Sequence, residues 1–162
     1  MAAAPTVDVL VRAMTGGDLD AVAAIHATQT RAIPPASWRK RVSGLLERAE
    51  PDSGVALVAV DARTGDPGRR ILGYLAGEVR SWEFGSGPAG WVFGLAVSPE
   101  QQGQGIARRL SDAALRRFRE MGVTTVRTMV RRDDVAVLRF FRAAGFVAGP
   151  YTELELNLEE TP

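Results

Sequence analysis

A glycine-rich loop between Gln102 and Gly105 carries the residues whose types and spacing are best suited to chemistry in this chain. The apolar run WVFGLAV, residues 91–97, precedes the loop and has the length of a buried strand, while apolar residues at helical spacing follow it from Ile106. Free backbone N–H groups and the positive end of the helix dipole meet at a helix N-terminus, and glycines let an anion approach the backbone closely. The segment therefore predicts a binding site for a phosphate or diphosphate.

Three known kinds of phosphate loop differ in the residues that accompany their glycines. A P-loop ends in Gly-Lys-Ser or Gly-Lys-Thr, whereas Gly105 is followed here by Ile106 and Ala107. A dinucleotide-binding loop has a small residue at the position of Arg108 and normally opens a βαβ unit. The pattern Q-x-x-G-x-A, formed by Gln102, Gly105 and Ala107, resembles the acetyl-CoA pyrophosphate loop of the GNAT-type N-acyltransferases.

A second block, RRDDVAVLRFFRAAGF at residues 131–146, extends this resemblance toward the end of the chain. It is similar to the second GNAT signature, V-R-x-D-N-x-x-A-x-x-x-Y-x-x-x-G-F. The matching residues are Asp133, Gly145 and Phe146, and the departures are Asp134 for Asn, Val137 for Ala and Phe141 for Tyr. The resemblance implies that Asp134 contacts the pantetheine arm of CoA or orders its helix, and that Phe141 makes an apolar contact with CoA. A phenylalanine has no hydroxyl with which to protonate the departing thiolate.

The resemblance also implies how the rest of the site binds acetyl-CoA. In the family, the strand before the loop splays from its neighbour, and its exposed backbone holds the pantetheine arm; the corresponding residues are Leu95, Ala96 and Val97. The backbone N–H groups around the pyrophosphate would belong to Gln102, Gly103, Gln104, Gly105, Ile106 and Ala107, with Arg108 or Arg109 near the adenosine phosphates. A backbone N–H at Leu95 or Ala96 would stabilise the oxyanion that forms when an amine attacks the thioester.

An alkyl amine acceptor must lose a proton before it attacks, because its pKa is about 10. Some family members use a glutamate near the start of the strand before the loop, but residues 90–92, Gly-Trp-Val, offer no carboxylate. Glu78, on the preceding strand, is the predicted substitute. It shares a strand face with Tyr74, and we expect a partly desolvated pocket to raise its pKa toward the range of a general base. The alternative is that Glu78 only pairs with Arg80 or another arginine.

The elements that position these residues suggest one domain over residues 1–162. Hydrophobic periodicity and turn residues predict the order strand, two helices, three strands, helix, strand, helix and two final strands. A strand is expected over Val55–Asp61, the last helix over Val135–Ala144, and the final two strands from Phe146 and from Glu153. This order resembles the GNAT fold, which is an α+β fold with αβα layers and a central mixed, mostly antiparallel sheet flanked by helices.

Composition restricts the partners and the location. The 20 Lys and Arg residues nearly balance the 19 Asp and Glu residues, and a net charge of +1 does not favour nucleic acid or an anionic membrane as a partner. With no cysteine, the chain has no disulfide, thiolate metal site or cysteine nucleophile. The first residues lack the pattern of a signal peptide, and no apolar run approaches the roughly 20 residues of a membrane span. We expect a cytoplasmic protein without a metal cofactor.

These features predict an N-acetyltransferase that moves an acetyl group from acetyl-CoA directly to an amine of a small molecule or peptide, with a homodimer left open. The alternative is a non-catalytic module that binds or senses acyl-CoA, which the missing tyrosine at Phe141 would suit. A dinucleotide-binding protein is a third interpretation. Release of free CoA in the presence of amines separates the first two, and competition between CoA and NAD(P) tests the third.

Overall fold

A computed structural model of the chain describes residues 7–30, 36–48, 53–63 and 70–159. The chain forms two compact units that divide between Met129 and Val130, here called the N-terminal and the C-terminal unit. Among the helices of the described ranges, none is both long and apolar enough to cross a membrane.

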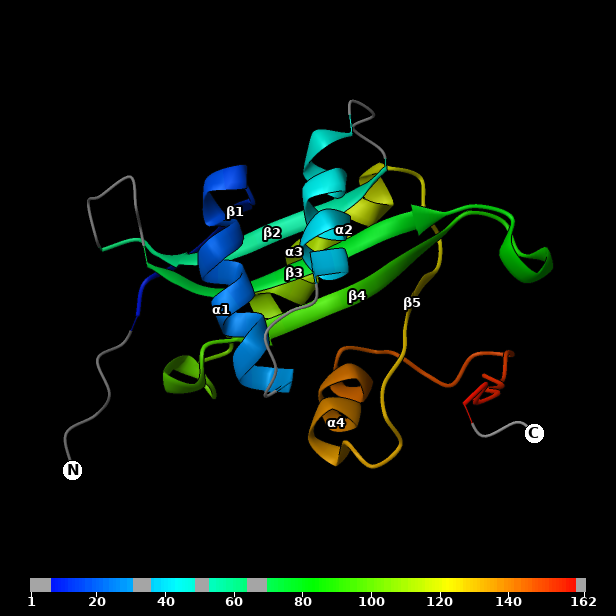
Figure 1. Ribbon diagram of the computed structural model, residues 1–162. Coiled ribbons are helices and arrows are strands. Elements are labelled where there is room, and N and C mark those ends of the chain that lie inside the picture. The colour runs from blue at the N-terminus through cyan, green and yellow to red at the C-terminus, as the bar shows by residue number, and fades with distance from the viewer. Residues whose placement is uncertain (1–6, 31–35, 49–52, 64–69, 160–162) are drawn as a thin grey trace. The chain divides into compact units, whose positions relative to one another are not determined.

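Among the described residues of the N-terminal unit, five strands form one sheet in the order β1-β2-β3-β4-β5 (Figure 1). The strands are β1 (Val9–Ala13), β2 (Gly54–Asp61), β3 (Ile71–Arg80), β4 (Ala89–Val97) and β5 (Val126–Thr128). Neighbours from β1 to β4 run antiparallel, and β5 pairs in parallel with β4. The prediction of a mixed, mostly antiparallel sheet is therefore confirmed.

Helices cover both faces of this sheet. α1 (Leu19–Thr30) and α2 (Ala36–Glu47) pack on one face, and α3 (Ile106–Glu120) packs on the other (Figure 1). The side chains of β2 explain the arrangement, because Leu57 and Ala59 join the core under α3, whereas Val58 and Val60 join the core under α1 and α2. Apolar residues at successive positions of a strand are typical of a sheet that is buried on both faces.

The position of α3 is set by a close approach to the sheet. The residues of α3 that are buried lie at helical spacing and comprise Ile106, Leu110, Ser111, Ala114 and Phe118. A Cβ atom at Gly90 of β4 would lie 2.8 Å from the Phe118 ring, and one at Gly77 of β3 would lie 3.1 Å from it. Glycine at both positions therefore lets Phe118 rest on the sheet, and the helix N-terminus comes to lie just beyond the end of β4.

A bulge in β4 divides that strand into two halves. Ala76 of β3 pairs with Gly94, but the next residue, Gly77, pairs with Val92. Phe93 is therefore an extra residue in β4, and a bulge of this kind bends the strand and leaves a backbone group outside the regular ladder.

The second half of β4 also has fewer strand partners than the first. The parallel ladder with β5 ends where Val92 pairs with Thr128. Within the described residues, the segment from Leu95 to Val97 has β3 as a neighbour on one side and no strand on the other. The predicted separation of this strand from its neighbour is confirmed, since β5 extends only over Val126–Thr128.

The C-terminal unit contains one helix, α4 (Val135–Ala143), among its described residues. The helix was predicted over nearly the same range, but the two strands expected from Phe146 and Glu153 are wrong for the described residues up to 159. Residues 153–156 alternate between glutamate and leucine, as in a half-buried strand, yet Leu154 and Leu156 are 91% and 72% exposed. Alternation alone does not make a strand, because the backbone groups of a strand need a neighbouring strand to pair with.

Candidate functional site

The loop after β4 presents an open backbone surface. It begins where the Ser98 N–H donates to the carbonyl of Leu72 at 2.8 Å, which anchors the loop to β3. Gly103 and Gly105 have φ values of +78° and +75°, in the left-handed region that favours glycine. A Cβ atom at either glycine would meet no other atom within 4 Å. The backbone is therefore accessible to a ligand on the side where a larger residue would place its side chain.

The first turn of α3 supplies donors to this surface. Gly105 is the N-cap, and the first amide of the helix that bonds back to it is that of Arg109, at 3.1 Å from the Gly105 carbonyl. The amides before Arg109 have no acceptor within the helix, as at every helix N-terminus. Ile106 is 1% exposed, so its side chain fixes the start of the helix in the core while the amides face the loop. These donors and the open glycines fit a diphosphate group.

Polar side chains tie the loop to the end of β4. Gln102 and Gln29 each direct Nε2 to the Val97 carbonyl, at 3.5 Å and 3.3 Å. Gln104 donates from Nε2 to Oε1 of Gln101 at 3.0 Å. Of the predicted phosphate contacts, Arg108 bonds to Asp112 along the helix, with Nε at 3.0 Å from Oδ1. Binding of the cofactor by Arg108 and by the loop amides stays a prediction.

The predicted pantetheine-binding residues lie together at the end of β4. Ala96 and Val97 are 6% and 8% exposed, so their side chains belong to the two cores and leave only backbone groups for a ligand. Leu95 packs partly against the core under α3. A short turn at Pro99–Gln101 connects Leu95–Val97 to Gln102–Ala107, and the contact from Gln102 to the Val97 carbonyl brings the two segments together.

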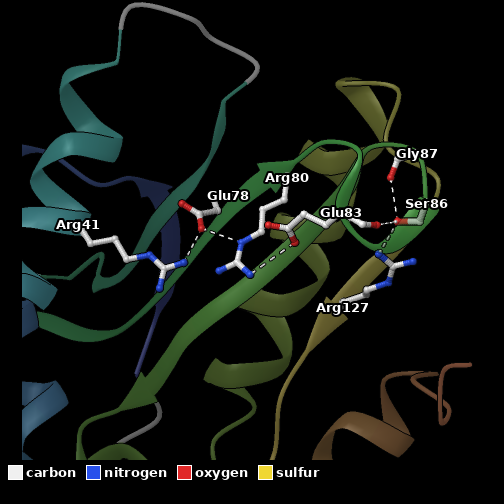
Figure 2. Close-up of polar contacts among 7 residues, drawn as sticks. All are labelled: Arg41, Glu78, Arg80, Glu83, Ser86, Gly87 and Arg127. Atoms are coloured by element: carbon white, nitrogen blue, oxygen red, sulfur yellow. Dashed lines mark hydrogen bonds and ion pairs between the residues drawn. The ribbon is translucent and has the colours of Figure 1, made fainter. Parts of the chain in front are cut away.

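Glu78 lies at the far end of β3 in a cluster of charged side chains (Figure 2). Its carboxylate accepts hydrogen bonds from Arg41 of α2 and from Nε of Arg80, the latter at 2.9 Å, and its side chain is 14% exposed. Burial acts to raise the pKa of Glu78, but the hydrogen bonds from the two arginines outweigh burial and lower the pKa overall. The predicted rise in the pKa of Glu78 is therefore wrong. Its role as a general base stays a prediction.

Tyr74 does not join Glu78 in a common pocket. Its hydroxyl lies 2.6 Å from Nδ1 of His26, and the His26 ring stacks on Trp38 with 4.4 Å between centroids. Burial raises the pKa of Tyr74, and loss of solvation lowers the pKa of His26, so both groups are neutral at pH 7. Gly94 leaves room for the tyrosine, because a Cβ there would lie 2.9 Å from the Tyr74 ring.

Sequence reasoning named Arg80 or another arginine as a partner of Glu78, and that pairing is confirmed, but it missed the aromatic rings under the arginines. The Arg41 guanidinium lies over the Phe93 ring at 3.9 Å, and the Arg80 guanidinium lies over the Trp91 ring at 4.8 Å. Arg127 of β5 lies 5.9 Å from the same Trp91 ring and donates to Oγ of Ser86 at 3.0 Å. No spacing signal could have found this group, because its members come from α2, β3, β4 and β5.

Asp134 and Phe141 belong to the C-terminal unit. Asp134 is the N-cap of α4, and its side chain accepts a hydrogen bond from the Val137 amide at 3.1 Å. Phe141 is 8% exposed and packs edge-on against Phe140 and Phe146, with centroids 5.2 and 5.1 Å apart. The expectation that Asp134 orders its helix is confirmed. Contact of either residue with CoA stays a prediction.

Comparisons with known proteins agree with this arrangement. Residues 20–146 match a family model described as the Acetyltransferase (GNAT) family. A mycothiol acetyltransferase of Sanguibacter keddieii is 32% identical over 142 residues, which cover 85% of this chain and 43% of the relative. One of Nocardiopsis dassonvillei is 39% identical over 59 residues, which cover 36% of this chain and 18% of the relative. The chain thus spans less than half the length of the curated relatives it matches.

Solved structures share the fold at low sequence identity. The aminoglycoside N-acetyltransferase AAC(6')-Iy in complex with CoA superimposes with a TM-score of 0.76 at 15% identity, over 94% of this chain and 96% of that one. A transcriptional regulator from Bacillus halodurans C-125 superimposes with a TM-score of 0.74 at 21% identity, over 93% and 100% of the two chains. These similarities establish the fold.

Proposed function

Since this chain belongs to the GNAT family of acetyltransferases, we propose that it transfers the acetyl group of acetyl-CoA directly to an amine. The observation that carries the proposal is that two features of the backbone follow one another along the chain. Among the described residues, the backbone of β4 has no strand partner beyond Val92 on one side. After a short turn at Pro99–Gln101, the open glycines of the loop lead into the amides of α3. One continuous stretch of backbone is thus suited to an extended arm that ends in a diphosphate.

Each part of this backbone has a chemical task in the proposal. The amides from Gln102 to Ala107 bind the diphosphate, with Arg108 nearby, and the edge from Leu95 to Val97 pairs with the pantetheine arm. An N–H at Leu95 or Ala96 donates to the thioester oxygen, where negative charge develops during attack. Acetyl-CoA, when bound, supplies the acetyl carbon that the amine attacks and the thiolate that leaves.

The reaction needs little help with protons when the thiolate leaves, but the ammonium group of the acceptor must be deprotonated before it attacks. A thiol has a pKa of about 8.5, so the thiolate leaves without an acid, and Phe141 in place of a tyrosine is compatible with turnover. The ammonium group of the acceptor must lose a proton, and Glu78 is the base predicted from the sequence. Its bonds to Arg41 and Arg80 keep it a carboxylate at neutral pH but make it a weak base.

The acceptor in this proposal is a small molecule or peptide. The names of two similar proteins support a small molecule, one a mycothiol acetyltransferase and the other an aminoglycoside N-acetyltransferase. We further propose that residues 1–162 act as one domain, because the family match runs through the boundary between the two units. A cytoplasmic location follows from the use of acetyl-CoA, and a homodimer is the oligomeric state to be tested first.

The experiment that tests the function measures release of free CoA from acetyl-CoA with a panel of primary amines. Turnover that depends on the amine, with acetylated amine as the product, is the expected result. Binding of acetyl-CoA without turnover of any amine would instead support an acyl-CoA-binding module, which the arginine-paired Glu78 and the missing hydroxyl at Phe141 favour. Displacement of CoA by NAD(P) would contradict both.

A further inference from the structure

We propose that Arg41 and Arg80, held by Glu78, bind a carboxylate of the acceptor. This inference rests on the proposed acetyl transfer, for which it names the substrate class: an amine that carries a carboxylate at some distance. The site consists of Arg41, Glu78 and Arg80, which Figure 2 shows, and of the rings of Trp91 and Phe93, all in the N-terminal unit.

The two guanidinium groups are brought together by a single oxygen atom. Nη2 of Arg41 and Nε of Arg80 both donate to Oε1 of Glu78. The Glu78 side chain is 14% exposed, while Arg41 and Arg80 are 37% and 29% exposed. The carboxylate is thus the covered member of the group, and the cations are on the solvent side. Glu78 orients the arginines, and the arginines are what a ligand would meet.

Both guanidinium groups lie over aromatic rings. Arg41 stacks on Phe93 and Arg80 on Trp91, so that one face of each cation is in contact with a ring. A stacked guanidinium keeps its N–H donors in its own plane, free to bond sideways. Among the described residues, Arg41 has Glu78 as its hydrogen-bond acceptor, which leaves most of its five donors for a ligand.

The charge of the cluster suits one added carboxylate. Arg41 and Arg80 carry two positive charges and Glu78 carries one negative charge, so these three side chains have a net charge of one positive. Glu83 forms an ion pair with Arg80 at a longer distance, 3.8 Å between Oε2 and Nη1. Paired in-plane donors of arginine match the two oxygens of a carboxylate, so the ligand class is an anion of that geometry.

The position of the cluster sets the length of the acceptor. Phe93, under Arg41, precedes Ala96 by three residues in β4, and a strand rises about 3.4 Å per residue. Along the strand, Phe93 under Arg41 therefore lies about 7 to 10 Å from Leu95 and Ala96, whose N–H groups are proposed to hold the reacting thioester, whereas Trp91 under Arg80 lies about 14 to 17 Å from them. An α-amino acid is too short to span this distance. An ω-amino acid with about four to six carbons, or a short peptide, has its amine and carboxylate suitably spaced.

The experiment compares acceptors that differ only in the carboxylate. We expect kcat/KM for 6-aminohexanoate to exceed that for 6-aminohexanamide by tenfold or more, and we expect activity to fall steeply from 4-aminobutyrate to glycine. Arg41→Gln and Arg80→Gln should each raise KM for the acid tenfold or more with a smaller change in kcat. Arg116→Gln removes the same charge from an exposed position of α3 and should keep the preference.

Glu78→Gln is the decisive variant, because orientation of the arginines by Glu78 and general-base catalysis by Glu78 predict different results. If Glu78 orients the arginines, the variant loses the preference for the acid through KM, although the cluster becomes more positive. A stronger preference for the acid, or an equal fall in kcat for acid and amide, would overturn the proposal; the second result would support Glu78 as the general base.

A binding measurement keeps the inference separate from the acetyltransferase proposal. Calorimetry should detect hexanoate but not hexanamide, with binding lost in Arg41→Gln, and thermal melts should show that each variant is folded. Hexanoate binding without turnover of any amine would contradict acetyl transfer and leave the carboxylate site standing. Turnover of amines without any preference for the acid, in a protein that does not bind hexanoate, would overturn the carboxylate site alone.

Discussion

The loop before α3 and the cluster around Glu78 lie in the same unit, but they are built from different parts of the chain. The loop uses backbone groups from one segment, Gln102 to Ala107, and its shape depends on two glycines with positive φ. The cluster uses side chains from α2, β3 and β4, and its shape depends on ion pairs and ring contacts between them. A site of the first kind tolerates changes in side chains outside its glycines, whereas a site of the second kind depends on each partner.

The largest expected effect tests the backbone site. Gly105→Asn keeps the left-handed conformation, which asparagine adopts more readily than other residues, but places a side chain in the open space above the loop. The dissociation constant for acetyl-CoA should rise roughly 100-fold, or about 2.7 kcal/mol. Calorimetry measures it. Gly122→Asn is the matched control, since Gly122 has a φ of +76° and open space at the other end of α3. Equal affinity for acetyl-CoA in the two variants would contradict the assignment of the diphosphate site to the loop.

An intermediate effect tests the cluster through stability. The pKa of Glu78 is lower in the folded state than its ordinary value of 4.5, so the folded state binds fewer protons. Its stabilising contribution is complete above pH 4.5 and is lost as the pH falls through the folded-state pKa. Glu78→Gln should cost about 1 to 2 kcal/mol at pH 7, the value of hydrogen bonds to a charged group, and less below pH 4.5.

Urea unfolding at pH 7, 5 and 4 measures this difference. Glu100→Gln is the control, because Glu100 pairs with Arg70 where both side chains are more than half exposed, and such pairs contribute little. A cost for Glu78→Gln that equals the control at every pH would show that the Glu78 cluster behaves like an ordinary surface pair.

The smallest expected effect concerns the neutral pair formed by His26 and Tyr74. Loss of solvation lowers the pKa of His26 below its ordinary 6.5, so the unfolded state binds the proton more readily. The contribution of neutral His26 is present above pH 6.5 and is lost as the pH falls below that value. His26→Gln should flatten the stability curve between about pH 6.5 and 5, by about 0.5 kcal/mol, because the group is partly screened by solvent. Thermal melts across this range measure it, and a curve parallel to the wild type would contradict the assignment.

The expected strands differ in whether their own residues were enough to predict them. β2 was predicted over nearly its full range, because apolar residues continue from Val55 to Val60 and both faces are buried. The strands expected from Phe146 and Glu153 were wrong, although Glu153 to Leu156 alternates regularly. A buried strand can be recognised from its own apolar residues. A half-buried strand also requires a neighbouring strand to pair with, and its own composition does not show whether one is present.

Glu78 shows the same limit for the site. The pattern of β3 placed Glu78 and Tyr74 on one strand face and led to the prediction of a raised pKa. Arg41, 37 residues away in sequence, acts together with Arg80 to reverse the direction of that shift, and the Tyr74 hydroxyl instead lies against His26, 48 residues away. A pKa depends on the groups within a few ångströms, and those groups come from elements that the sequence does not place.

The sequence by itself determined the loop with Gly103 and Gly105, the helix that follows it and the family to which both belong. These features depend on backbone conformation over a few consecutive residues, which glycine spacing and helical periodicity specify directly. Only the tertiary structure decided the bulge at Phe93, the end of the ladder at Val92 and the identity of Arg41 as the second arginine at Glu78. Each of these depends on the register between strands or on packing between distant elements, and such contacts form only when the whole sheet and its helices come together.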